Sequence, residues 1–120
     1  MSNSYFIGII SGTSMDAADC ALLDFLAPPP FIIDFTCEVM PPRLKEQLIE
    51  LTRNKSIDLR ELGSTDVAVA EFFGKVVNKL LERNNIDPGS VLAIGSHGQT
   101  IWHEPPQTAR NRPFSTQIGD

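Results

Sequence analysis

Short apolar runs in the first third of the chain predict strands. Residues 5–10, 17–25 and 31–39 are rich in strand-forming side chains and are separated by turn residues, so we expect a three-stranded antiparallel meander. Three prolines at 28–30 separate the last two runs, because proline cannot continue a central strand. The second run has few polar interruptions, which predicts a strand that is buried on both faces.

The middle of the chain has the apolar spacing of helices. A first helix is predicted to begin at the prolines 41–42 and to end near Asn54, with leucines recurring four and three residues apart on one face. A second helix opens on a capping box formed by Asp58 and Glu61, and it carries the longest apolar stripe in the chain until turn residues follow from Asn84. We expect this stripe to pack on the sheet rather than to form a cofactor site.

A fourth apolar run, at residues 91–94, has no polar alternation and predicts a central strand covered on both faces. It leads into a predicted loop at 95–100, in which two glycines bracket His97. Ligands of open α/β sheets bind beyond the carboxyl ends of such strands, which favours ligand contact by His97. A single histidine in a loop is also commonly a structural hydrogen-bonding residue, so both interpretations stay open. Residues 114–118 alternate and predict a last strand.

The turn between the first two strands carries the clearest candidate chemistry. Its sequence, Ser-Gly-Thr-Ser-Met-Asp at 11–16, makes a poor core and a good phosphate cradle. Gly8 and Gly12 let the backbone approach a ligand. The hydroxyls of Ser11, Thr13 and Ser14 add donors, and Asp16 adds a carboxylate that could face a hydrated cation. The same residue types are also ordinary in a hairpin turn that binds nothing.

Two related loop motifs are excluded. A P-loop requires a lysine directly after its second glycine, and no lysine follows Gly12 within reach. A nucleophile elbow requires glycine two residues after its serine and a helix behind it, whereas this chain has Asp16 there and a predicted strand. The turn is therefore expected to hold a ligand rather than to attack one.

Composition and charge narrow the class of protein. The 120 residues, of which 42% are hydrophobic and 21% charged, are typical of one soluble globular domain, which we take as residues 1–120. A net charge of −5 argues against nonspecific binding to nucleic acid or to an anionic membrane. Because no apolar run approaches the ~20 residues of a membrane helix and no signal peptide is visible, we expect a cytoplasmic location. Cys20 and Cys37 fall in predicted strands without a metal-binding cluster and are expected to be buried free thiols.

Three segments together resemble the N-terminal part of the anhydro-N-acetylmuramic acid kinase family, within the superfamily of actin, sugar kinases and Hsp70. They are Phe-Ile-Gly-Ile-Ile-Ser-Gly-Thr-Ser-Met-Asp at 6–16, Ala-Ile-Gly-Ser-His-Gly-Gln-Thr-Ile-Trp-His-Glu-Pro at 93–105, and Thr-Gln-Ile-Gly-Asp at 116–120. The resemblance covers essentially the whole chain. It implies an α/β fold, a partial ribonuclease-H-like lobe of the actin-like ATPase type, with an antiparallel meander, a parallel strand and packing helices.

The resemblance also implies a function. The family's enzymes use ATP and Mg²⁺ to open the 1,6-anhydro ring of anhydro-N-acetylmuramate with water while phosphorylating its 6-oxygen, in cytoplasmic recycling of the cell wall. ATP and this amino sugar are the implied small-molecule partners, with a homodimer implied for the full-length protein.

By motif match, the residues of the first turn and the start of the next strand would hold the phosphates of ATP. These residues are Gly12, Thr13, Ser14, Met15, Asp16, Ala17, Ala18 and Asp19. Asp16 and Asp19 are the candidates for contact with Mg²⁺ through water. The sugar pocket would be lined by His97, Gln99 and Thr100, with Asp120 in the same cleft.

The chain departs from the family in two respects. Family members commonly have glycine where this chain has Ala17, and they place the general base in segments that follow the part resembled here. We therefore expect these 120 residues to fold as a truncated lobe that neither binds ATP tightly nor turns over. Two other functions stay open: a non-enzymatic, actin-like or Hsp70-like nucleotide-binding module, and an assembly domain that pairs through an open sheet edge.

Overall fold

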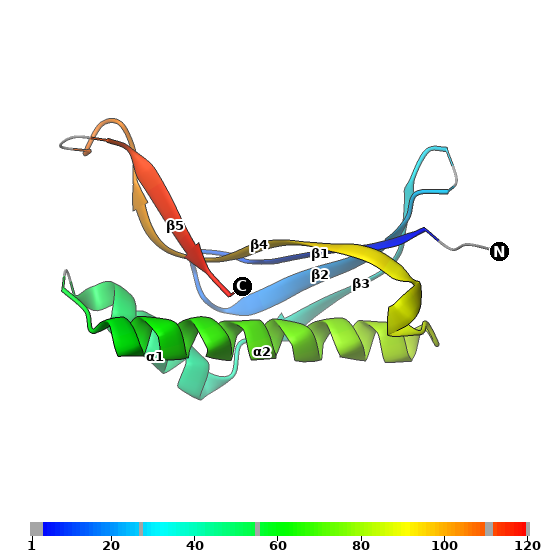
Figure 1. The fold of residues 1–120 in the computed structure, drawn as a ribbon, viewed down its shortest axis with the longest axis horizontal. Coiled ribbons are helices and arrows are strands. Elements are labelled where there is room, and N and C mark those ends of the chain that lie inside the picture. The colour runs from blue at the N-terminus through cyan, green and yellow to red at the C-terminus, as the bar shows by residue number, and fades with distance from the viewer. Residues whose placement is uncertain (1–3, 27, 55, 110–111, 120) are drawn as a thin grey trace.

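The chain folds as one five-stranded sheet with two helices on one of its faces (Figure 1). The structure is a computed structural model that describes residues 4–26, 28–54, 56–109 and 112–119. In chain order the elements are β1 (Tyr5–Ser11), β2 (Ala17–Asp24), β3 (Phe31–Val39), α1 (Pro42–Arg53), α2 (Leu59–Arg83), a 3₁₀ turn (Pro88–Ser90), β4 (Val91–Glu104) and β5 (Phe114–Ile118).

The strand order is β3-β2-β1-β4-β5. β1, β2 and β3 form an antiparallel meander, β4 lies parallel to β1, and β5 returns antiparallel to β4. Two helices occupy the crossover between β3 and β4, as a parallel connection requires. The predicted fold class, an α/β meander with a parallel strand and packing helices, is confirmed, and it is consistent with a partial actin-like lobe.

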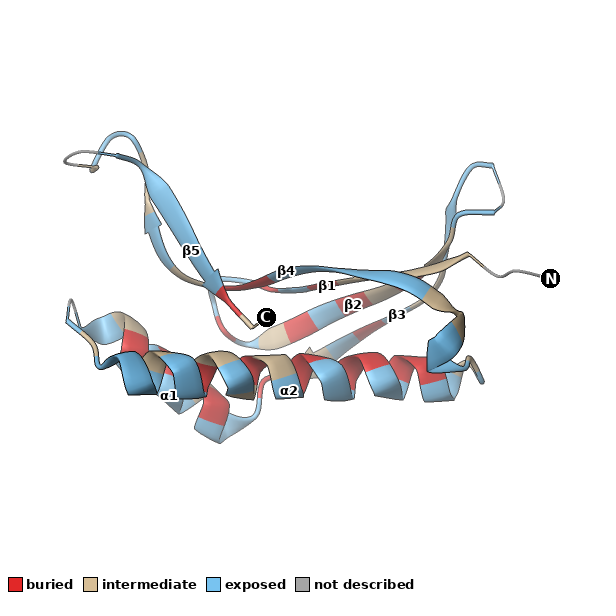
Figure 2. Cartoon of the chain, in the orientation of Figure 1, coloured by how far each residue is buried: buried red, intermediate tan, exposed pale blue. Residues whose placement is uncertain are grey.

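The core lies between the sheet and the long helix α2. The apolar stripe of α2, which includes Val69 and Leu80, packs on the face of the sheet formed by alternate residues such as Ile7 and Leu22. On the opposite face Val39 is 79% exposed, because the described helices cover only one side (Figure 2). The prediction that residues 17–25 are buried on both faces is therefore wrong, and β2 alternates between the core and solvent.

β4 is much longer than predicted. The segment 95–100 is not a loop but the middle of this strand, since β1 pairs with its first part and β5 with its last. Ile9 pairs with Ser96 and Ile10 with Gly98, so His97 is the extra residue of a β-bulge. Gly98, at φ +74°, adopts the left-handed conformation that favours glycine.

The first half of β4 is also less buried than predicted. Leu92 and Ile94 are 63% and 53% exposed. The reason is that α2 crosses β1, β2 and β3 and leaves this part of β4 uncovered (Figure 2). A run without polar alternation indicated burial on both faces, but the described helices do not reach it.

Both helices begin and end close to the predicted residues. α1 has Pro42 in its first turn, and Asp58 caps α2 by accepting a hydrogen bond from the N–H of Arg60 at 2.8 Å. Among the described residues, neither helix combines the length and apolarity needed to span a membrane.

The two cysteines differ in burial. Cys20 is buried, as predicted, and burial raises the pKa of its thiol to about 11. Cys37 is exposed, contrary to the prediction.

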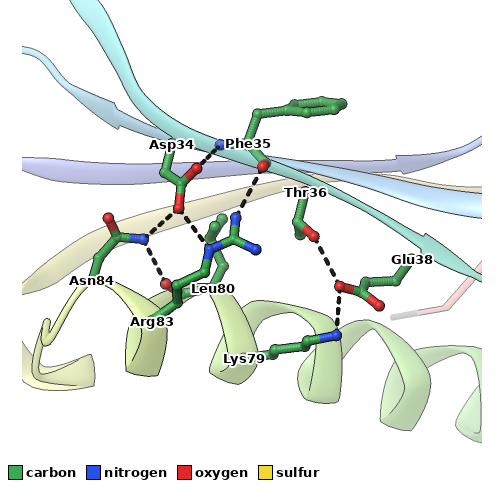
Figure 3. A network of polar contacts seen from close by, with 8 residues as sticks. All are labelled: Asp34, Phe35, Thr36, Glu38, Lys79, Leu80, Arg83 and Asn84. Carbon is green, nitrogen blue, oxygen red and sulfur yellow. Dashed lines mark hydrogen bonds and ion pairs between the residues drawn. The ribbon is translucent and has the colours of Figure 1, made fainter.

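Polar contacts join the end of α2 to β3 (Figure 3). Arg83 Nε donates to Asp34 Oδ2 at 2.8 Å, and Asn84 Nδ2 donates to the same oxygen at 2.8 Å. One turn earlier, Lys79 Nζ lies 2.9 Å from Glu38 Oε1. We call these five residues the helix-end network. They join the C-terminal end of α2 to β3.

Candidate functional site

The β1–β2 turn presents polar groups on one side and anchors itself on the other. The N–H of Met15 donates to the carbonyl of Gly12 at 3.1 Å, which closes the turn. Met15 has a φ of +58°, unusual for a residue other than glycine, and its side chain is buried in the core. Its neighbours Thr13 and Ser14 are exposed. The buried methionine therefore holds a turn whose hydroxyls face solvent, as a phosphate cradle requires.

Asp16 contacts one residue of α1 and one residue of the segment that follows β3. Its carboxylate forms an ion pair of 2.7 Å with Lys45 of α1, and its carbonyl accepts a hydrogen bond of 2.8 Å from the N–H of Met40. The hydrogen bond from Lys45 and its positive charge, helped by Ser14, hold the pKa of Asp16 below its usual value. Asp16 is therefore ionised at neutral pH, and its carboxylate is paired with the ammonium group of Lys45.

Asp19 lies further along β2, exposed, opposite Ile10 and Cys37. Its carboxylate raises the pKa of the Cys37 thiol by hydrogen bonding to it. Of the other residues predicted to hold phosphate, Ala18 is fully buried and Ala17 half-buried, so these two contribute backbone groups only.

Gln99 lies beneath the turn, with no exposed surface. Its Oε1 accepts a hydrogen bond from the hydroxyl of Ser11, and its Nε2 donates to the carbonyls of Gly12 and Thr100, both at 3.1 Å. We call Ser11, Gly12 and Gln99 the buried amide network. The prediction that Gln99 lines a sugar pocket stays a prediction, and in this chain its polar atoms are engaged with the backbone and with Ser11.

A hollow of about 260 Å³ lies beside the bulge of β4. It is lined by Ser96, His97, Gly98, Gln117, Ile118 and Gly119, which come from the bulge and from the end of β5. The half-buried Thr100 accepts a hydrogen bond of 3.1 Å at its hydroxyl from Gln117 Nε2. Asp120, predicted in the same cleft, lies outside the described residues, but its neighbour Gly119 lines the hollow. Two larger hollows, beside α1 and α2, contain none of the predicted site residues.

The turn, the bulge and the end of β5 meet at one edge of the sheet. Ser11, the last residue of β1, pairs with Gln99, and Gln99 pairs with Ile118 at the end of β5. Three segments far apart in the sequence are thus neighbours (Figure 1). The sequence indicated the turn and His97. It offered Ser11 as a hydroxyl donor to a ligand, whereas the buried Ser11 hydroxyl donates to Gln99, and it missed Lys45, whose partner Asp16 lies 29 residues away in the chain.

The donor set at this edge suits a hydrated cation better than a directly bound one. Within the described ranges, no group of three or more His, Cys, Asp and Glu side chains could hold a metal ion. Mg²⁺ commonly keeps several waters and takes its other ligands from a substrate's phosphates. A single exposed carboxylate such as Asp16, next to exposed hydroxyls, fits an ion bound in that way.

Comparison with known proteins decides the family. A family model described as anhydro-N-acetylmuramic acid kinase matches residues 4–120. The chain belongs to the anhydro-N-acetylmuramic acid kinase family. The turn at residues 12–16 and the bulge around His97 both lie within the matched part.

Curated relatives of the same name match along the whole chain. The anhydro-N-acetylmuramic acid kinase of Coxiella burnetii (strain Dugway 5J108-111) is 44% identical over 120 residues, which are 100% of this chain and 31% of the relative. The kinase of Shewanella amazonensis is 43% identical over 120 residues, 32% of its length. That of Mannheimia succiniciproducens is 37% identical over 120 residues, 31% of its length. This chain therefore spans about a third of the length of the curated relatives it matches.

Proposed function

We propose that this chain is the phosphate-binding lobe of an anhydro-N-acetylmuramic acid kinase, which uses ATP to phosphorylate O6 of its sugar while water opens the 1,6-anhydro ring. The observation that carries the proposal is the β1–β2 turn. The hydroxyls of Thr13 and Ser14 are exposed at the end of a strand, and the carbonyl of the preceding Gly12 accepts a hydrogen bond from Gln99. Membership of a kinase family supports phosphate as the ligand of that turn.

In the proposed reaction, the oxygen of a water molecule bonds to C1 of the sugar as the C1–O6 bond breaks. O6 bonds to the γ-phosphorus as the bond to the leaving ADP breaks. The proton of the water passes to a carboxylate base, which we place outside these 120 residues. The part assigned to this lobe is positioning, because phosphoryl transfer depends mainly on orientation and on stabilisation of charge.

The two substrates are assigned to neighbouring parts of the sheet edge. The turn at residues 12–19 would bind the phosphates of ATP, and the hollow at His97, Thr100 and the end of β5 would receive the sugar. Mg²⁺ would be contacted through water by Asp16 and Asp19, and it would neutralise charge on the phosphates. We further propose that residues 1–120 are a truncated N-terminal ribonuclease-H-like lobe of a cytoplasmic protein that is a homodimer at full length.

The assignment of the two substrates is tested by replacing His97 in the full-length protein. We expect His97→Ala to reduce turnover of the sugar at least tenfold while the affinity for ATP changes little. His103→Ala is the matched control, because His103 is an exposed histidine of the same strand that does not line the hollow. Turnover can be followed by ADP release and ATP affinity by calorimetry.

Two results would contradict this proposal. Equal losses of sugar turnover and ATP affinity in His97→Ala, or no change in either, would remove His97 from the sugar site. A full-length protein that binds ATP but phosphorylates no sugar would favour a non-enzymatic nucleotide-binding module instead.

A further inference from the structure

We propose that Gln99 is a positioning residue for the nucleotide: its buried amide sets the orientation of the Gly12 peptide, and thereby aims the backbone N–H of Thr13 at the phosphates. The inference rests on the proposed function of the turn and adds a residue that does not itself touch the ligand. It follows from the contacts of one side chain, from the geometry of one peptide bond and from the bulge in β4.

The orientation of the Gln99 amide is dictated by its partners. Two of them, the carbonyls of Gly12 and Thr100, can only accept hydrogen bonds, so the NH₂ group must face them. The amide oxygen then faces Ser11, whose hydroxyl donates to it. Both donors and the acceptor are used, and the side chain has no contact with solvent. Few other side chains of this length can supply two donors and an acceptor in one plane.

The contact with Gly12 determines where the next N–H points. A trans peptide is planar, with its C=O and N–H directed to opposite sides. The carbonyl of Gly12 is held inward by Gln99 Nε2 and by the N–H of Met15, each at 3.1 Å. The N–H of Thr13 in the same peptide unit must therefore point away from the interior. This is the direction from which a phosphate would approach the exposed turn.

The bulge at His97 brings Gln99 into place. Side chains of a strand alternate between the two faces of a sheet. One extra residue therefore moves every side chain that follows it to the opposite face. With His97 inserted, Gln99 pairs with Ser11 and shares its buried face. Without the bulge, position 98 would pair with Ser11 instead. The bulge that places His97 at the hollow thus also places Gln99 under the turn, and it links the two proposed subsites.

The test uses the full-length protein with Gln99→Glu, which keeps the shape and the acceptor but loses the donors when ionised. At pH 8 we expect the KM for ATP to rise roughly 10- to 30-fold, the effect of losing one buried hydrogen bond. The KM for the sugar should change less than threefold. On lowering the pH to 6 the ATP defect should shrink, because a buried carboxyl has a raised pKa and donates again once protonated.

Ser11→Ala provides a second variant that preserves the fold. It removes only the hydroxyl that holds the amide oxygen, so we expect a smaller rise of the KM for ATP, about threefold, at an unchanged KM for the sugar. Calorimetry with a non-hydrolysable ATP analogue should show the same trend: the affinity should be highest for the wild type, lower for Ser11→Ala and lowest for Gln99→Glu.

Each contrary outcome has a distinct meaning. If the wild type binds no ATP analogue, the proposed function of the turn is contradicted, and so is the role of Gln99 that depends on it. If the wild type binds but Ser11→Ala is indistinguishable from it, the positioning role alone is overturned, whether or not Gln99→Glu folds. If Gln99→Glu raises the KM for ATP and the KM for the sugar equally, and neither rise depends on pH, then Gln99 only stabilises the fold and does not position the nucleotide.

Discussion

The buried amide network and the helix-end network join distant segments by opposite physical means. Ser11, Gly12 and Gln99 are uncharged, and the side chains of Ser11 and Gln99 are buried. Asp34, Glu38, Lys79 and Arg83 are charged, and all four side chains remain partly exposed to solvent. Water and salt compete with the second network but do not reach the buried side chains of Ser11 and Gln99 in the first. An uncharged, fully paired network can therefore fix the shape of a turn, whereas an exposed charged one mainly guides the end of a helix.

The largest expected effect comes from removing the bulge that supports the buried network. A Cβ atom on Gly98 would lie 2.6 Å from the carbonyl oxygen of Ile118, and its φ of +74° strains any other residue. We expect Gly98→Ala to destabilise the chain by roughly 2–4 kcal/mol, measured by urea denaturation. Gly74→Ala is the control. A Cβ atom at Gly74, an exposed position of α2, would meet no atom within 4 Å, so this substitution should stabilise the chain by up to about 1 kcal/mol. Similar results for both variants would show that the bulge is not constrained.

Removing the Gln99 amide from the buried amide network should lower the free energy of unfolding somewhat less than Gly98→Ala does. Gln99→Met fills nearly the same volume but leaves the hydroxyl of Ser11 and the carbonyl of Thr100 without their partner. We expect a loss of about 2 kcal/mol, since Gly12 retains its bond from Met15. The loss should be the same in 0.05 M and 1 M salt, because no charge is removed. A strong dependence on salt would contradict the contrast between the two networks.

The helix-end network should respond in the opposite way. Arg83→Met removes the contacts of its guanidinium with Asp34 and with the carbonyl of Phe35. The resulting fall in Tm should be smaller than that of Gln99→Met, and it should shrink further at high salt, where exposed charges are screened. Thermal denaturation at low and high salt measures both features. An Arg83→Met effect as large as that of Gln99→Met would mean that the surface network contributes more than its exposure allows.

The sequence predicted most elements of the fold because their signals are local. The apolar spacing of α2 and the cap at Asp58 are contained within a few neighbouring residues. The run of Gly, Ser and His at 95–98 looked like a loop, since such residues are weak strand formers. Strands β1 and β5 supply pairing partners on both sides and override that preference. Burial of Ile94 failed as a prediction for a related reason, because it depends on where a distant helix crosses.

The site divides in the same way between local and distant signals. The turn at residues 12–16 was predictable because glycine, hydroxyls and a carboxylate are adjacent in the sequence. The contacts that hold it are not adjacent: Lys45 reaches Asp16 from α1, and Gln99 reaches Gly12 from β4. No spacing rule connects these positions. The sequence thus indicates which groups meet a ligand, and only the fold indicates what orients them.

The smallest effect concerns protonation of the helix-end network. Hydrogen bonds from Arg83 and Asn84 lower the pKa of Asp34 to about 2, below the roughly 3.9 of an unfolded aspartate. A lowered pKa adds stability above the unfolded value, and this is lost as the pH falls through about 4 towards about 2. The Tm difference between wild type and Asp34→Asn should therefore be largest above pH 5 and narrow towards pH 2. Glu71→Gln, which also removes one carboxylate, at an exposed position of α2, is the control for the loss of a negative charge. A difference that stays constant from pH 6 to pH 2 would mean that Asp34 stabilises β3 through its shape and not through its charge.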